Sequence, residues 1–168
     1  MTFYRITATL SLILFAIGLV MGTGASAGDP NDQNALAGIT DGKALFDINL
    51  AQAEKVPLYL QVIQMTHSSL NKQGVTPDLI VAFRGPAVQF ITRNRDGMEP
   101  EKGIILDKIA DQVRALKALG IRFEACAVAT NLFQIDNASI LPEIQVVGNT
   151  FNSLIGYHAK GYAAIPIM

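Results

Sequence analysis

The stretch that decides the fold is Asp78-Leu79-Ile80-Val81-Ala82-Phe83-Arg84-Gly85-Pro86-Ala87. Its five consecutive apolar residues, 79–83, are typical of a strand that is buried on both faces. Arg84 and the Gly85-Pro86 pair then break the strand and begin a turn. We therefore expect a central strand at 79–83, with Arg84 at its carboxyl end.

Upstream of this strand, the sequence predicts a strand at 43–48 and a helix that Pro57 opens and Gly74 ends. Leu58, Val62 and Met65 follow one another at helical spacing, and Tyr59, Ile63 and Leu70 widen the apolar stripe.

Downstream, predicted helices alternate with predicted strands. Helices are expected at 88–91, around 106–116, at 127–135 and at 149–159, and strands at 121–126, 144–147 and 162–165. Such alternation specifies crossover units and a parallel sheet. We expect an α/β fold, a flavodoxin-like or Rossmann-like parallel sheet of about five strands covered by helices on both faces.

Composition limits the class of protein. The chain has 168 residues, 50% of them hydrophobic and 16% charged, and a formal net charge of −1. These values fit a globular chain and exclude disorder, and they exclude the broad cationic surface of a nucleic-acid-binding protein. A single cysteine excludes an internal disulfide and a CxxC pair.

Residues 1–27 have the pattern of a Sec-type signal peptide. Arg5 precedes an apolar run from Leu10 to Met21, and Ala25-Ser26-Ala27 matches the signal-peptidase rule. The run is 12 residues long, short of the roughly 20 that span a membrane. We expect cleavage after Ala27, a periplasmic or secreted protein with no stable membrane span, a flexible lead-in at 28–42 and one domain at 43–168. The alternative is an uncleaved N-terminal anchor.

Three residues end predicted strands, namely Arg84, Cys126 and Asn149. Ligands and chemistry gather at the carboxyl ends of strands in open parallel sheets. Cys126 directly precedes a helix, whose first amides and dipole would lower the pKa of the thiol, and a neighbouring Arg84 guanidinium would act in the same direction. Asn149 is a candidate hydrogen-bond donor. Gly85 opens a further helix start that could hold an anionic group.

The residues alone leave three interpretations of Cys126. It is a buried inert thiol, half of an intermolecular disulfide, or a reactive centre. Neither GxxxxGK[ST] nor GxGxxG occurs in the chain, and its two histidines have no metal-ligand spacing. We therefore expect no cofactor and no metal.

Three segments together resemble one family. Arg84-Gly85-Pro86-Ala87-Val88 follows a hydrophobic strand, Leu119-Gly120-Ile121-Arg122-Phe123-Glu124-Ala125-Cys126 leads to the cysteine, and Gly161-Tyr162-Ala163 lies near the end. Their order and spacing are similar to those of the DsrE/DsrF-like superfamily, in particular its exported single-domain branch. The resemblance implies a homo-oligomer, commonly a trimer or hexamer, and a role in sulfur metabolism with a persulfide on Cys126.

Two functions follow as hypotheses. The first is a sulfur carrier or thiol relay, sulfurtransferase-like, that holds sulfane sulfur on Cys126 and exchanges it with a donor or acceptor protein. The second is a non-catalytic homo-oligomeric module that binds a small ligand or a partner and in which Cys126 is structural.

Overall fold

The computed structural model describes residues 30–168. The predicted signal peptide and its cleavage site after Ala27 lie outside the described residues. Five strands form one parallel sheet with the order β4-β3-β2-β1-β5. The strands are β1 (Asp41–Ile48), β2 (Thr76–Phe83), β3 (Arg122–Cys126), β4 (Gln145–Val147) and β5 (Ala163–Ile167).

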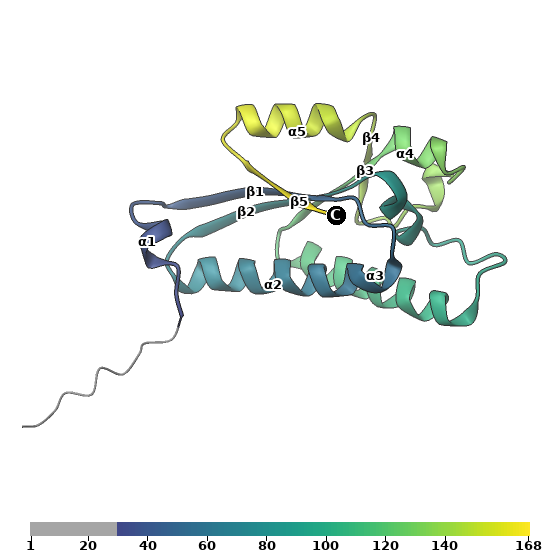
Figure 1. Ribbon diagram of the computed structural model, residues 1–168, viewed down its shortest axis with the longest axis horizontal. Helices are drawn as coiled ribbons and strands as arrows, with labels where there is room; N and C mark the ends of the chain where they lie inside the picture. The colour runs from purple at the N-terminus through teal and green to yellow at the C-terminus, as the bar shows by residue number, and fades with distance from the viewer. Residues whose placement is uncertain (1–29) are drawn as a thin grey trace, which may run out of the picture. The chain divides into compact units, whose positions relative to one another are not determined.

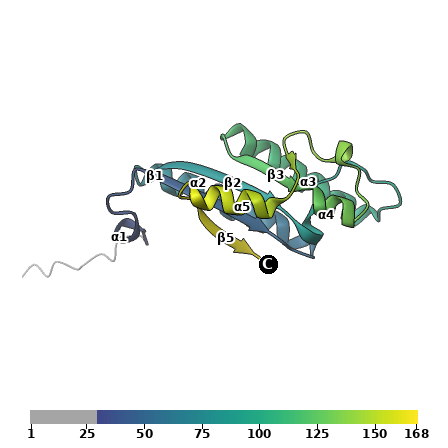
Figure 2. The ribbon, with the colours of Figure 1, turned by 90° about the horizontal axis from the view of Figure 1, so that it is seen from above.

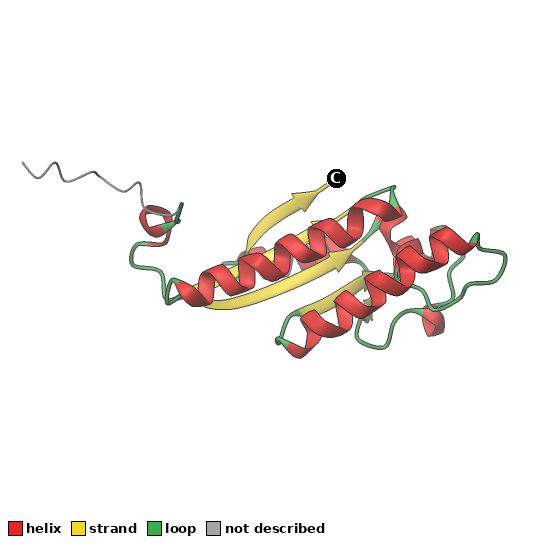
Figure 3. Ribbon diagram, turned by 90° about the horizontal axis from the view of Figure 1, so that it is seen from below, coloured by secondary structure: helices red, strands yellow, loops and turns green. Residues whose placement is uncertain are grey.

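Helices cover both faces of the sheet. Helices α2 (Val56–Lys72) and α3 (Pro100–Ala118) lie side by side on one face, and α5 (Thr150–Ala159) lies on the other (Figures 1 and 3). The chain moves in one direction across the sheet from β1 to β4 and then returns to the opposite edge for β5. Because crossovers between parallel strands are right-handed, this reversal places α5 on the opposite face from α2 and α3. The predicted α/β sheet is confirmed.

Shorter helices complete the connections. They are α1 (Gln33–Leu36) and α4 (Ala127–Leu132), and the 3-10 helices η1 (Ala53–Lys55), η2 (Gly85–Phe90) and η3 (Asn137–Ser139). Helix α1 and the first two residues of β1 fall within 28–42, where the sequence predicted a flexible lead-in. No helix within residues 30–168 is long and apolar enough to cross a membrane.

The hydrophobic core is unequal on the two faces. The larger cluster fills the space between the sheet and helices α2 and α3, with residues such as Phe46, Val81 and Phe123. The smaller cluster lies under α5 and contains Leu45, Ile80, Ala82 and Tyr162. A single ten-residue helix therefore covers the second face, and β5 stays exposed from Ala163 to Pro166.

Helix α2 buries only part of the stripe that the sequence suggested: Ile63 lies in the core, and Tyr59 and Leu70 pack against it. Leu58, Val62 and Met65 are 58%, 45% and 62% exposed, whereas Val56, Leu60 and Ile63 are buried. Both sets have helical spacing and both are apolar, so periodicity alone did not distinguish them. The buried set faces the sheet because the crossover from β1 fixes how the helix is rotated.

Candidate functional site

The junction between β3 and α4 places Cys126 at the carboxyl edge of the sheet. Cys126 is the last residue of β3 and the N-cap of α4, with extended backbone angles. Its thiol is free, and the residue is 6% exposed. The backbone N–H groups of Val128 and Ala129, in the first turn of α4, point back to the sulfur. The sulfur therefore lies where unpaired helical amides favour a negative charge.

A second helix also contributes to the environment of Cys126. Burial raises the pKa of the thiol, but the backbone N–H of Thr150, the hydroxyl of Thr150 and the amides of Ala129 and Val128 lower it further than burial raises it. The pKa of Cys126 is consequently below its usual value. Amides from the starts of both α4 and α5 thus stabilise the thiolate.

Thr150 is a site residue that the sequence analysis missed. It is the first residue of α5 and is fully buried. Its hydroxyl oxygen has no hydrogen-bond partner of ordinary geometry among residues 30–168, which leaves the thiolate of Cys126 as the charge it can stabilise. One sequence feature could have indicated Thr150. It follows Asn149, a favoured N-cap residue after a predicted strand, and the backbone amide of the first helical residue has no partner within its helix.

Asn149 caps helix α5. Its side-chain Oδ1 accepts a hydrogen bond from the backbone N–H of Phe151 at 2.9 Å. In this position the side chain orients the first turn of α5, and thereby Thr150, toward β3. Asn149 therefore caps the helix whose first residue, Thr150, contributes to the lowered pKa of Cys126.

Arg84 and Cys126 occupy neighbouring positions on adjacent strands. The printed register of β2 and β3 ends with Phe83 opposite Ala125, and Arg84 and Cys126 are the residues that follow these two in the chain. The Arg84 guanidinium, however, donates from Nε and Nη2 to the Asp47 carboxylate at 2.7 and 2.9 Å. Asp47 lies on β1, on the other side of β2 from β3. The charge of Arg84 is therefore paired with a carboxylate and directed toward β1.

Gly85 lets the chain turn closely past the end of β1. Its φ is +53°, and a Cβ at this position would lie 2.1 Å from the Asn49 side-chain oxygen. The positive φ favours glycine, and a larger residue would also have to displace the Asn49 side chain. Gly85 thus lets the chain pass close to Asn49, the residue that follows β1.

Comparison with known families identifies the chain. The model of the DsrE/DsrF-like family matches residues 33–167, nearly the whole described chain and including Cys126. The chain belongs to the DsrE/DsrF-like family. The resemblance seen in the sequence motifs is confirmed.

Solved structures share the fold of this DsrE/DsrF-like protein. The protein of unknown function MTH1491 from Methanobacterium thermoautotrophicum is similar with a TM-score of 0.61 and 19% identity, over 76% of this chain and 100% of that one. The ychN protein from E. coli is similar with a TM-score of 0.53 and 14% identity, over 75% of this chain and 99% of that one. A search of curated proteins gave no match.

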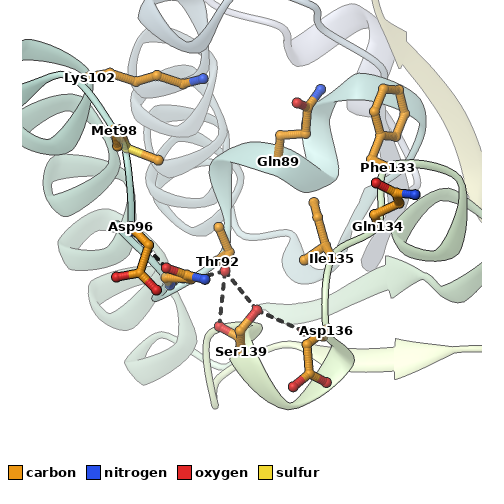
Figure 4. A pocket seen from close by; sticks show the side chains of 11 residues that line it. Gln89, Thr92, Asp96, Met98, Lys102, Phe133, Gln134, Ile135, Asp136 and Ser139 are labelled. Carbon is orange, nitrogen blue, oxygen red and sulfur yellow. Dashed lines mark hydrogen bonds between the residues drawn. The ribbon is translucent and has the colours of Figure 1, made fainter.

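A separate pocket of about 280 Å³ lies away from the cysteine (Figure 4). Its wall includes Thr92, Asp136 and Ser139, and none of Arg84, Gly85, Cys126 or Asn149. Ser139 Oγ and Thr92 Oγ1 are 2.8 Å apart, and the Asp136 carboxylate accepts from the Ala138 amide at 2.9 Å. These hydrogen bonds join loop residues of the DsrE/DsrF-like domain that are distant in the chain, such as Thr92 and Ser139.

Residues 30–168 contain no group of three His, Cys, Asp or Glu side chains placed to hold a metal ion.

Proposed function

We propose that this protein is a sulfur carrier that holds sulfane sulfur as a persulfide on Cys126. One observation carries the proposal, namely that Cys126 lies at the starts of α4 and α5, where backbone amides of both helices lower the pKa of the thiol. The thiolate is the nucleophile in sulfur exchange, and a lowered pKa raises its fraction near neutral pH. Membership of the DsrE/DsrF-like family supports a role in sulfur relay.

Transfer of sulfur from thiosulfate illustrates the proposed reaction. The Cys126 thiolate attacks the sulfane sulfur of thiosulfate, a new S–S bond forms, and the bond between the sulfane sulfur and the sulfonate breaks. Sulfite leaves with the electron pair of that bond. The thiolate of an acceptor protein then attacks the outer sulfur, and Cys126 leaves as a thiolate. Each step moves one sulfur atom and needs no further oxidant or reductant.

The low exposure of Cys126, 6%, suits a carrier. A persulfide is a reactive group, and shelter from solvent limits its loss to thiols other than the intended acceptor. The ring of Phe151, 5.5 Å from the Arg84 guanidinium, belongs to the same rim and is 56% exposed. We propose that the donor and acceptor approach along this rim.

Mass spectrometry of the intact protein tests the proposal. Incubation with thiosulfate, polysulfide or glutathione persulfide should add about 32 Da per sulfur atom, and peptide mapping should place it on Cys126. The Cys126→Ser variant should gain no mass.

Alkylation kinetics supply the complementary measurement. Iodoacetamide should modify Cys126 with a pH midpoint below that of an unperturbed cysteine, about 8.5. No sulfur adduct, together with slow alkylation only at high pH, would overturn the carrier function. That result would support the alternative of a non-catalytic binding module with a structural cysteine.

We also propose that the protein is a homo-oligomer, a trimer or hexamer, in which a second copy covers α5 and β5. Ile155 on α5 and Ile165 on β5 are 69% and 37% exposed, and β5 pairs with only one neighbour. A shallow groove of about 490 Å³ between them is lined by Leu154, Ile155, Ala164 and Pro166, with Asp47 and His158. Exposed apolar surface of this kind marks an interaction site.

Sedimentation equilibrium checks the assembly. The wild type should sediment as three or six chains, and Ile155→Glu with Ile165→Glu should dissociate it. Ile104→Glu on α3, at a residue that is 70% exposed, is the matched control and should not change the mass. A monomeric wild type would refute the assembly.

The cellular location of the protein follows from the predicted signal peptide. We propose that the mature protein is periplasmic or secreted, begins at Gly28 and has no membrane anchor. N-terminal sequencing of protein isolated from the cell would identify Gly28 as the first residue, and an intact Met1 would instead support a retained anchor.

A further inference from the structure

Helix α2 has an outer face without charge. Residues 56–71 include no Asp, Glu, Lys or Arg, whereas α3 beside them carries charged residues along its whole length. Leu58, Val62 and Met65 follow one another along the outer face of α2, and each of these residues is about half-exposed. A surface helix ordinarily carries charged residues on its solvent face, so an exposed face of this composition indicates a contact surface.

Two shallow hollows follow one another along this face. The first, of about 330 Å³, lies between α2 and α3 and has Glu54 and Leu58 in its wall. The second, of about 470 Å³, is formed by α2 alone and has Ser68 and Lys72 in its wall, and Gln61 lines both. In the view from below, no other described element covers α2 (Figure 3). The face is therefore open over the whole helix, which is roughly 25 Å long.

Opposite charges mark the two ends of the outer face. Glu54 lies in η1, directly before α2, and Lys72 is the last residue of α2. Both residues are exposed, and neither forms an ion pair within residues 30–168. Two copies of α2 that pack antiparallel about a two-fold axis bring Glu54 of each copy to Lys72 of the other. Parallel packing would instead place like charges together at both ends.

The same register also matches large side chains to small ones. With Glu54 opposite Lys72, the two-fold axis passes at the level of Ile63, and Leu58 of each copy faces Ser68 of the other. The serine leaves room in the second hollow for the leucine. Val62 and Met65 lie on either side of the axis, where an interface has its core. Interface cores are poor in charged residues and rich in apolar ones, as this face is.

We propose that the outer face of α2 binds α2 of a second copy of this chain, antiparallel and about a two-fold axis. Burial of the apolar residues supplies the affinity, and the two Glu54–Lys72 pairs determine the direction of the helices. A two-fold contact of this kind uses the same patch on both copies, so it closes on itself.

This surface is separate from the one proposed on α5 and β5. Helix α5 lies on the face of the sheet seen from above, and α2 lies on the opposite face (Figure 2). Pairing through α2 therefore joins two trimers into a hexamer. The number six rests on the proposed trimer, whereas the pairing of two chains through α2 does not, and neither involves Cys126.

Sedimentation equilibrium of the full chain tests the pairing. The wild type should contain six chains, and Val62→Glu with Met65→Glu should halve that mass. Ile155→Glu with Ile165→Glu, on the other surface, should leave dimers. Leu132→Glu on α4, at a residue that is 75% exposed, is the control and should keep the wild-type mass. If only the α5 surface is wrong, the wild type should be a dimer that Val62→Glu with Met65→Glu makes monomeric. A wild type of one or three chains, or a mass that Val62→Glu with Met65→Glu does not change, would overturn the proposal.

A charge exchange tests the direction of the helices. Glu54→Lys places two lysines together at each end of the antiparallel pair and should raise the dissociation constant at least about tenfold. Glu54→Lys with Lys72→Glu restores opposite charges and should recover most of the wild-type affinity. Because the exchange opposes the helix dipole of α2, a more stable single chain does not account for such recovery. An affinity that Glu54→Lys leaves unchanged, or that the double variant does not recover, would refute the antiparallel arrangement.

Discussion

Thr150 lies beside Cys126, and both its backbone N–H and its buried hydroxyl act to lower the pKa of the thiol. The two residues come from different helix starts, and they meet because β3 and β4 pair with Cys126 opposite Val147. The short turn Gly148-Asn149 then brings the first residue of α5 over the end of β3. The lowered pKa of the thiol therefore depends on the pairing of two strands.

Replacement of Thr150 by valine should raise the pKa of Cys126. Valine has nearly the same shape but lacks the hydroxyl, so the favourable effect of the hydroxyl on the thiolate is lost while the backbone N–H remains. Alkylation by iodoacetamide at pH 7 should slow about two- to tenfold, the equivalent of one hydrogen bond of about 0.5–1.5 kcal/mol. Thr150→Ser keeps the hydroxyl and is the control. An unchanged rate in Thr150→Val would show that the hydroxyl does not act on the sulfur.

The Asp47→Asn variant should be less stable than the wild type. Asp47 and Arg84 form a bidentate pair whose side chains are 8% and 18% exposed. Loss of one partner leaves a largely buried charge, at a cost of about 3 kcal/mol, measurable by urea unfolding. The double variant Asp47→Asn with Arg84→Met should recover part of the loss, because the unpaired guanidinium is removed. Strict additivity of the two changes would contradict the pairing.

Alanine at Gly85 should destabilise the fold by about 1–3 kcal/mol. The substitution combines a positive φ with a Cβ 2.1 Å from the Asn49 oxygen. Gly120→Ala is the matched control, because Gly120 also has a positive φ (+88°) but nothing within 4 Å of its Cβ position. Urea unfolding should show a larger loss for Gly85→Ala, and Asn49→Ala should relieve the difference. Equal losses in the two glycine variants would show that the contact with Asn49 is unimportant.

Asp78 should make stability sensitive to acid. Burial raises the pKa of Asp78, but hydrogen bonds from Tyr162 and Arg122 lower it further, so the pKa lies below its usual 3.8. The contribution to stability is therefore complete above about pH 4 and is lost as the pH falls through the lowered value. Because Asp78 and Arg122 are about 40% exposed, the effect is about 1 kcal/mol or less.

Unfolding measured between about pH 2 and pH 5 tests the role of Asp78. The Asp78→Asn variant should lose less stability over this range than the wild type. Asp111→Asn, an exposed change on α3, is the control and should follow the wild type. Identical pH profiles of the wild type and Asp78→Asn would contradict the lowered pKa.

Local sequence signals predicted the elements well. The apolar run 79–83 lies within β2, and the strand expected at 121–126 corresponds to β3. Such segments are readable because burial on both faces of a sheet requires apolar residues at every position. Helix α2 was predicted less well, because apolar residues occur around much of its surface. Only packing against the sheet determined that Leu60 is buried and that Leu58 and Val62 are exposed.

The candidate site could be predicted only in part, because most of its contacts join residues that are distant in the chain. The position of Cys126 at a strand end and a helix start follows from residues close in the chain. The roles of Thr150 and Asp47 depend on partners from other strands or helices, and no local pattern marks them. The sequence predicted Asn149, which precedes Thr150, as a candidate site residue because it is polar and follows a strand. Its side chain caps helix α5.

The sequence by itself determined that the chain is a parallel α/β domain of the DsrE/DsrF-like family with a single cysteine at the edge of the sheet, because apolar runs, turn residues and their spacing are local properties. Only the tertiary structure decided which groups surround that cysteine and that Arg84 pairs with Asp47. The physical reason is that hydrogen bonds and ion pairs act over a few ångströms, and the strand order determines which distant residues come within that range.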